Sequence, residues 1–351
     1  MRHLFAGLVS GLTWAGAAFA QTPPPAPPAS PAPPRSFEII RLDPAFDRLI
    51  AADTKLETIA VIPGFSGEGP LWHRGRLLVS DQKNGPIYEV SLDGTYRVLL
   101  DKASGQLDPG SKVNQGPTSL AIWKSGQILI ARQAARDIGR LSPDGTTGSM
   151  ISSLDGKRFN SPNDMIVGRD GSIWFTDPPF GLPSFDRTPG APPPPDKDIP
   201  FNGVFRWKKG EVEAVITDMT MPNGIGLSPN GKILYVANSI PQMYIRAYDI
   251  GTDGVLSNPR DFARFTSNSP MGRGVPDGLK VDARGNVWTT GPGGIIVLAP
   301  DGHMLGRIQT PAMTSNVAFG EDGRSLFLTS GVNIYRIRTL TKGQSPPFPD
   351  R

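Results

Sequence analysis

Residues 163–177 read NDMIVGRDGSIWFTD, a polar start followed by two short apolar segments on either side of a glycine turn. β-Branched and aromatic residues dominate both segments, and such runs are typical of strands. Asp-Gly between them is a common turn pair in antiparallel hairpins. The stretch therefore predicts a β-hairpin that begins at a polar residue.

The same pattern occurs six times along the chain, with starts separated by 38 to 60 residues. Repeats of this period, each with room for about four strands, indicate an all-β fold, a six-bladed β-propeller. An open β-solenoid or a sandwich is the alternative. The six copies are residues 68–81, 118–132, 163–177, 223–238, 277–290 and 315–330.

Three further features bear on how the ring is built. LETIAVI (56–62) precedes the first copy, and we expect it to supply a strand to the last blade and close the ring. SLDG, SPDG and APDG, which end at Gly94, Gly145 and Gly302, mark turns after later strands. The longest spacing contains a Pro-rich insertion, residues 178–203, which is too long for a hairpin turn and is expected to be a lid or binding loop.

The first 20 residues, MRHLFAGLVSGLTWAGAAFA, have a basic start, an apolar middle and small residues at the end. They predict a signal peptide cleaved after Ala20 and an exported protein, periplasmic or secreted, with no membrane association after cleavage. A membrane anchor is the alternative, but the apolar run is short for a span. We expect a Pro-rich linker at 21–35, the propeller at 36–345 and a tail at 346–351.

The amino-acid composition limits the classes of partner that we expect. The chain of 351 residues has a formal net charge of +4 and no cysteine, so it forms no disulfide. Its Lys and Arg residues form no dense cluster interleaved with aromatic residues, so we expect no nucleic-acid partner. The sequence does not indicate an oligomeric state.

One position can be compared around the predicted ring, at the start of each innermost strand. Pseudo-symmetry brings all six occupants to the mouth of the central channel. Four of them carry a carboxylate or carboxamide oxygen. The occupants are Glu68, Thr118, Asn163, Asn223, Asp277 and Ser315.

This set predicts a metal site formed by Glu68, Asn163, Asn223 and Asp277. Oxygen-only ligands favour a divalent cation, foremost Ca²⁺, with Mg²⁺, Mn²⁺ or Zn²⁺ as alternatives. Without a cation, Glu68 and Asp277 would repel each other in a partly dry channel. A Cys/His zinc site is excluded, because the chain has no cysteine and its histidines fall in unrelated places. For any single Asn or Asp of the set taken alone, a turn residue is the favoured interpretation.

The second strand of each blade returns to the same end of the channel. Gln133 and Asp177 stand at or just after two of these strand ends, and Arg132 precedes Gln133. We expect Arg132, Gln133 and Asp177, together with Asn163, to bind substrate. Strand-end turn residues and an exposed arginine are the alternatives.

Across residues 50–340 the chain resembles the SMP-30/gluconolactonase/LRE-like family of six-bladed propellers. The resemblance is carried by EGPLW (68–72), SPNDMIV (161–167), WFTDPPFGL (174–182), PNGIGLSPN (222–230) and PDGLKVDARGNVW (276–288). It implies a metal-dependent lactonase in which Glu68, Asn223 and Asp277 are metal ligands and Asn163 is a ligand or substrate contact. It also implies that Asp277 is the catalytic acid/base. The segment ARQAARDIGR (131–140) departs from the family, since bacterial relatives have a CEHGNRR-like stretch there.

The predicted reaction is hydrolysis of a lactone, such as a gluconolactone, with a metal-polarised carbonyl and a water activated by Asp277. A Ser-based triad is not expected, because no G-x-S-x-G motif occurs. The alternatives are a non-catalytic exported propeller that binds carbohydrate or protein with a structural Ca²⁺, and hydrolysis of phosphotriesters or other esters.

Overall fold

A computed structural model of the protein describes residues 35–108, 110–186, 188, 191–266 and 272–348. Pro34–Arg351 forms one compact unit. The predicted signal peptide and nearly all of the Pro-rich linker lie outside the described residues. Among the described residues, no helix is long and apolar enough to cross a membrane.

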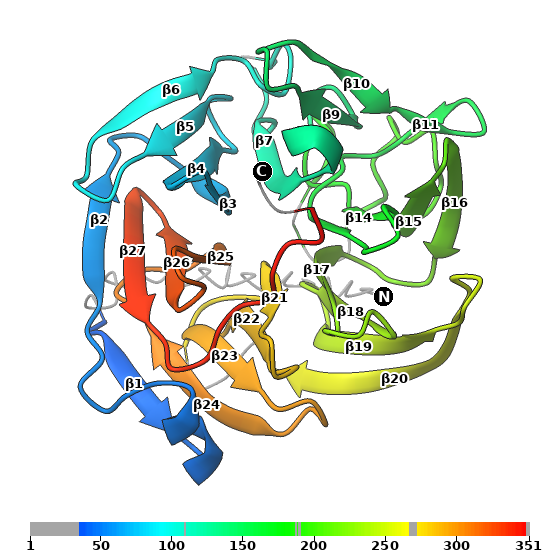
Figure 1. The fold of residues 1–351 in the computed structure, drawn as a ribbon. Helices are drawn as coiled ribbons and strands as arrows, with labels where there is room; N and C mark the ends of the chain where they lie inside the picture. Colours follow the sequence, from blue (N-terminus) through cyan, green and yellow to red (C-terminus); the bar gives the residue numbers. More distant parts are fainter. Residues whose placement is uncertain (1–34, 109, 187, 189–190, 267–271, 349–351) are drawn as a thin grey trace, which may run out of the picture. The chain divides into compact units, whose positions relative to one another are not determined.

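Six antiparallel sheets are arranged in a ring, which confirms the predicted six-bladed propeller (Figure 1). We call the region enclosed by their innermost strands the channel. In each blade the first strand is innermost, and the six predicted copies supply the first two strands. Blade 1 contains β3 (Gly67–His73), β4 (Arg76–Asp81), β5 (Ile87–Val90) and β6 (Tyr96–Leu100); blade 2 contains β7 (Pro117–Ile122), β8 (Ile128–Arg132), β9 (Asp137–Leu141) and β10 (Thr147–Ile151); blade 3 contains β13 (Met165–Val167), β14 (Ile173–Asp177), β15 (Gly203–Lys208) and β16 (Glu211–Ile216).

The second half of the ring repeats this order. Blade 4 contains β17 (Pro222–Leu227), β18 (Ile233–Asn238), β19 (Met243–Ile250) and β20 (Leu256–Phe265); blade 5 contains β21 (Leu279–Val281), β22 (Val287–Gly291), β23 (Gly294–Leu298) and β24 (Met304–Gln309); blade 6 contains β25 (Asn316–Gly320), β26 (Ser325–Ser330) and β27 (Asn333–Arg338). Short elements outside the blades are the 3₁₀ turns η1 (Pro44–Arg48) and η2 (Lys124–Gly126) and the hairpin of β11 (Ser153–Leu154) with β12 (Lys157–Arg158).

The Asp-Gly turns lie where the sequence predicts them. Gly94, Gly145 and Gly302 have φ angles of 88°, 85° and 90°. Each joins the third and fourth strands of its blade and donates its N–H to the residue three before it. Glycine is favoured at such left-handed positions because a β-carbon would be strained there.

The ring is closed by a strand from the N-terminal side. β2 (Glu57–Val61) pairs with β27 and becomes the outer strand of blade 6, which confirms the prediction for 56–62. Trp72 of blade 1 stacks on Phe327 of blade 6, with ring centroids 5.2 Å apart. The first and last blades are therefore joined by both backbone pairing and aromatic packing.

A second N-terminal strand was not predicted. β1 (Glu38–Arg41) pairs with β24 and adds a fifth strand to blade 5. The following turn η1 inserts Phe46, which is fully buried, against the apolar core between blades 5 and 6. β1 therefore covers the outer edge of the blade 5 sheet, which would otherwise be unpaired.

The C-terminal segment, residues 339–348, crosses the face of the propeller opposite the starts of the inner strands (Figure 1, red). Ala283 N–H donates to the Lys342 carbonyl, Gly343 N–H to the Gly323 carbonyl, and Gln344 Nε2 to the Leu227 carbonyl at 2.7 Å. Phe348 packs against the apolar core of blades 2 and 3. We call this segment the C-terminal strap.

Truncating Phe327 should weaken ring closure. Phe327→Ala removes a fully buried ring stacked on the neighbouring blade, and such changes cost about 3–5 kcal/mol of unfolding free energy. Urea unfolding followed by tryptophan fluorescence would measure it, with Val98→Ala, at a 49% exposed site, as the control. A loss in Phe327→Ala no larger than in the control would contradict the role assigned to this contact.

Candidate active site

The six residues compared in the sequence all lie within two residues of the start of an innermost strand, where neighbouring blades touch. Ser119 N–H donates to the Asn163 carbonyl at 3.1 Å, joining blades 2 and 3. Gly278 N–H donates to the Ser315 carbonyl at 2.9 Å, joining blades 5 and 6. The predicted register therefore corresponds to one end of the channel, which we call the mouth.

The two hydroxyl residues of the set hold neighbouring blades together. Thr118 Oγ1 donates to the Asn163 carbonyl at 2.7 Å, and Ser315 Oγ donates to the Gly67 carbonyl at 2.6 Å. Each bond crosses from one blade to the next. Their hydroxyls are thus used in closing the ring.

Glu68 places a carboxylate inside the protein. It is only 5% exposed, and its Oε2 accepts hydrogen bonds from Gly69 N–H at 2.8 Å and from Asn316 Nδ2 at 2.9 Å. Burial raises the pKa of Glu68 to about 7, although these two hydrogen bonds act in the opposite direction. The ionised form is therefore poorly solvated and would be stabilised by a nearby cation.

Asn223 presents an oxygen that has no hydrogen-bond partner. Its Nδ2 donates to Ser239 Oγ at 3.0 Å, and Ser239 Oγ in turn donates to the Pro276 carbonyl at 2.7 Å. These contacts fix which end of the amide is the oxygen. Oδ1 is buried and unpartnered, and a buried polar atom in this state costs free energy unless a ligand satisfies it.

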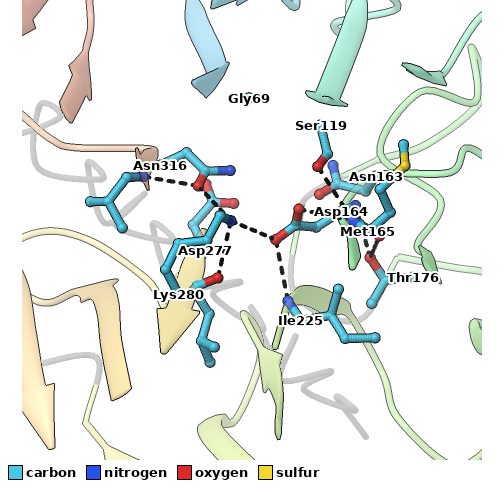
Figure 2. Close-up of polar contacts among 12 residues, drawn as sticks. Gly69, Ser119, Asn163, Asp164, Met165, Thr176, Ile225, Asp277, Lys280 and Asn316 are labelled. Carbon is cyan, nitrogen blue, oxygen red and sulfur yellow. Dashed lines mark hydrogen bonds and ion pairs between the residues drawn. The ribbon is translucent and has the colours of Figure 1, made fainter. Parts of the chain in front are cut away.

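Asn163 and Asp277 are half-buried at the same end of the channel, and Figure 2 shows them on opposite sides of it. Asn163 is held through its backbone, by Thr176 as well as by blade 2. Asp277 N–H donates to Thr290 Oγ1 at 3.0 Å, which anchors its strand start to the second strand of blade 5.

These residues fit an oxygen-liganded cation. A buried carboxylate and an unpartnered amide oxygen are the donor types that Ca²⁺ and Mg²⁺ prefer. Within the described ranges, no group of three or more His, Asp or Glu side chains is arranged to hold a metal. A cation at the mouth would therefore depend on the amides of Asn163 and Asn223 as well as on the two carboxylates.

Sequence reasoning missed a second polar layer, one residue further along the inner strands, to which Asp164 of blade 3 and Asn316 of blade 6 belong. Lys280, three residues after Asp277 in blade 5, reaches this layer with its side chain (Figure 2). Asp164 is 1% exposed, and Lys280 Nζ lies 3.9 Å from its Oδ2. The only sequence signal was that a charged or amide residue sits directly after or near a predicted ligand.

The residues predicted to bind substrate have contacts within the protein. Arg132 forms a two-point ion pair with Asp137, Nε to Oδ1 at 2.6 Å and Nη2 to Oδ2 at 2.5 Å. Asp177 accepts backbone N–H groups from Asn160 at 2.7 Å and Ser161 at 2.8 Å. Gln133 is buried, and its Oε1 has no partner. Their contact with substrate stays a prediction.

The atypical segment 131–140 anchors the insertion. Arg136 Nε donates to the Phe159 carbonyl at 2.5 Å, and its Nη1 donates to the carbonyl of Asp196 at 3.2 Å. Its Nη2 lies 3.5 Å from Asp198 Oδ1. The insertion joins β14 to β15 at the mouth end, so the atypical segment helps to hold a loop beside the mouth.

A cavity of about 710 Å³ lies at the other end of the channel. The downstream halves of the inner strands line it, with Trp72, Ile122 and Phe319 among them, and the C-terminal strap borders it. None of the four predicted ligands contributes to its lining. Lys280 also lines this cavity, whereas Asp164 and Asn316 do not.

The fold and the oxygen-rich mouth define a six-bladed propeller with a candidate cation-binding channel. Residues 66–332 match the model of the SMP-30/Gluconolactonase/LRE-like region. The chain belongs to this family.

Similar proteins include several lactonases. A gluconolactonase of Zymomonas mobilis is 33% identical over 321 residues, which cover 87% of each chain. A pentonolactonase of Haloferax volcanii is 29% identical over 273 residues, 75% of this chain and 81% of that protein. A solved gluconolactonase structure from Xanthomonas campestris gives a TM-score of 0.74 at 31% identity, covering 89% of this chain and 99% of that chain.

Asp177 should make stability depend on pH. Burial raises its pKa from 3.8 to about 7, so between these values the folded state keeps a proton that the unfolded state has released. Stability therefore falls as pH rises from about 4 to about 7, by on the order of 4 kcal/mol. Asp177→Asn should lose this component, so its stability relative to wild type should increase across the same range.

Urea unfolding at several pH values from 4 to 8 would measure the difference. Asp93→Asn is the control, because the pKa of this exposed carboxyl is lowered below 3.8 and it titrates outside the range. A difference between Asp177→Asn and wild type that stays constant with pH would contradict the assignment.

Proposed function

We propose that the protein is a metal-dependent lactonase that opens a sugar lactone at the channel mouth. The observation that carries the proposal is that a buried carboxylate, Glu68, and an unpartnered amide oxygen, Asn223 Oδ1, both lie at one end of the channel. The lactonases among the relatives support the reaction class.

Glu68, Asn163, Asn223 and Asp277 would hold the cation, with Ca²⁺ as the first choice. When bound, it would act as a Lewis acid toward the carbonyl oxygen of the lactone. Asn163 and Asn223 would contribute neutral oxygens, so that two carboxylates balance a divalent charge. Glu68 would serve mainly to bind.

Asp277 would move the proton. Water attacks the carbonyl carbon, and the Asp277 carboxylate takes one of its protons. When the bond between that carbon and the ring oxygen breaks, the proton passes to the ring oxygen, and the product is a hydroxy acid. A lactone is an activated ester, so no covalent nucleophile is required.

The mouth is also where specificity would arise. The insertion lies beside it and is held by Arg136. Gln133, whose Oε1 is buried and unpartnered, is close to the start of the insertion, since a β-carbon placed on Gly181 would lie 2.7 Å from this oxygen. We expect Arg132, Gln133, Asn163 and Asp177 to shape or contact the substrate pocket.

A lactone panel tests the reaction. The protein should release acid from gluconolactone or a related sugar lactone, detected with a pH indicator, and EDTA should abolish the activity. Added Ca²⁺ should restore it. Ca²⁺ that raises the melting temperature while no lactone is opened would favour a non-catalytic propeller with a structural ion, and turnover of phosphotriesters alone would favour the other hydrolase reaction.

Replacing the proposed base tests the mechanism. Asp277→Asn retains an oxygen ligand and removes the proton acceptor, so kcat at saturating Ca²⁺ should fall by roughly 10²- to 10⁴-fold. Circular dichroism and the melting temperature should show an intact fold. Turnover at the wild-type rate would rule out Asp277 as the base.

A further inference from the structure

The second polar layer of the channel has a defined composition. Its six positions follow the predicted ligand register by one residue, and three of them are glycines that leave room for the neighbouring blade. The positions are Gly69, Ser119, Asp164, Gly224, Gly278 and Asn316.

Asn316 sits in this layer because Gly278 has no side chain. A β-carbon on Gly278 would lie 2.1 Å from Asn316 Oδ1, which is far shorter than the van der Waals contact distance of these atoms. The glycine therefore lets the amide of blade 6 lie against the backbone of blade 5. Asn316 itself is 3% exposed.

The two ends of the Asn316 amide face groups of opposite charge. Oδ1 accepts from Val317 N–H at 2.8 Å and from Lys280 Nζ at 3.5 Å (Figure 2). Nδ2 donates to Glu68 Oε2 at 2.9 Å. Only this orientation gives the carboxylate a donor and gives the ammonium an acceptor, so the network decides the direction of the amide.

Lys280, which belongs to blade 5, also contacts a residue of blade 3. Its Nζ donates to the Leu279 carbonyl at 3.0 Å and lies 3.9 Å from Asp164 Oδ2. Asp164 in turn accepts Met165 N–H at 2.9 Å and Ile225 N–H at 3.2 Å. A chain of polar contacts thus runs from Asp164 through Lys280 and Asn316 to Glu68, across blades 3, 5, 6 and 1.

We propose that Asn316, oriented by Lys280 and accommodated by Gly278, is a positioning residue that fixes Glu68 for cation binding. This inference rests on the proposed function of the mouth. Both hydrogen bonds that the structure gives Glu68 reach Oε2, so the carboxylate is pinned through one oxygen and Oε1 is the one offered to an ion. Partners that orient a ligand in this way commonly change metal affinity roughly 10- to 100-fold when removed.

Calcium binding to three purified proteins tests the proposal. Asn316→Leu keeps the size of the side chain and removes the donor to Glu68. Isothermal titration with Ca²⁺ should give a Kd weaker than wild type by roughly 10-fold or more, while kcat at saturating Ca²⁺ stays within about 3-fold of wild type. Ser119→Ala is the matched control, because Ser119 holds the same position in blade 2 and bonds to Met165 N–H rather than to Glu68. Its Kd should equal that of wild type.

Three results would overturn the proposal. A wild-type Kd in Asn316→Leu would overturn it, and so would an equal loss in Ser119→Ala. If Asn316→Leu does not fold, Asn316→Ala, which only shortens the side chain, takes its place in the same comparison. A wild-type protein that binds neither Ca²⁺, Mg²⁺ nor Mn²⁺ also overturns it. A protein that binds Ca²⁺ but opens no lactone refutes the proposed reaction, and the Kd comparison still decides the role of Asn316.

Discussion

Six inner strands converge on one channel, and their backbones lie too close together for a side chain at every position. A β-carbon on Gly69 would lie 1.9 Å from the Thr118 carbonyl oxygen, and one on Gly224 would lie 2.0 Å from the Asp277 carbonyl oxygen. This crowding buries groups of the channel wall, among them Glu68, which is 5% exposed. A charged group placed there needs hydrogen bonds from the protein or a bound ion of opposite charge. This constraint explains the raised pKa of Glu68 and its two hydrogen bonds.

The protein meets the constraint with matched charges and dipoles. Lys280 lies near Asp164, and the Asn316 amide is aligned between the ammonium of Lys280 and the carboxylate of Glu68. Hydroxyls at Thr118 and Ser315 bond to neighbouring backbones instead of adding charge. The mouth is left with an acidic character that suits a divalent cation.

The blades and the mouth register could be predicted from local patterns, because each hairpin carries its own alternation and turn residues. β1 could not, since four residues without a turn signal pair with a strand far along the chain. Asp164, Lys280 and Asn316 were missed for a different reason. Strand alternation assigns consecutive residues to opposite faces. Asp164 precedes β13 and Asn316 is the first residue of β25, so this alternation does not extend back to Asn163 and Ser315. Lys280 is three residues after Asp277 and outside the register that was compared.

The C-terminal strap has a practical consequence for handling the protein. It runs across the face opposite the mouth and ends its described course at Phe348, against the core of blades 2 and 3. A linker attached directly after Phe348 would begin on that opposite face. Immobilisation on a bead or electrode through such a linker would therefore leave the mouth turned toward the solution, whereas coupling through the insertion would place the support beside the mouth.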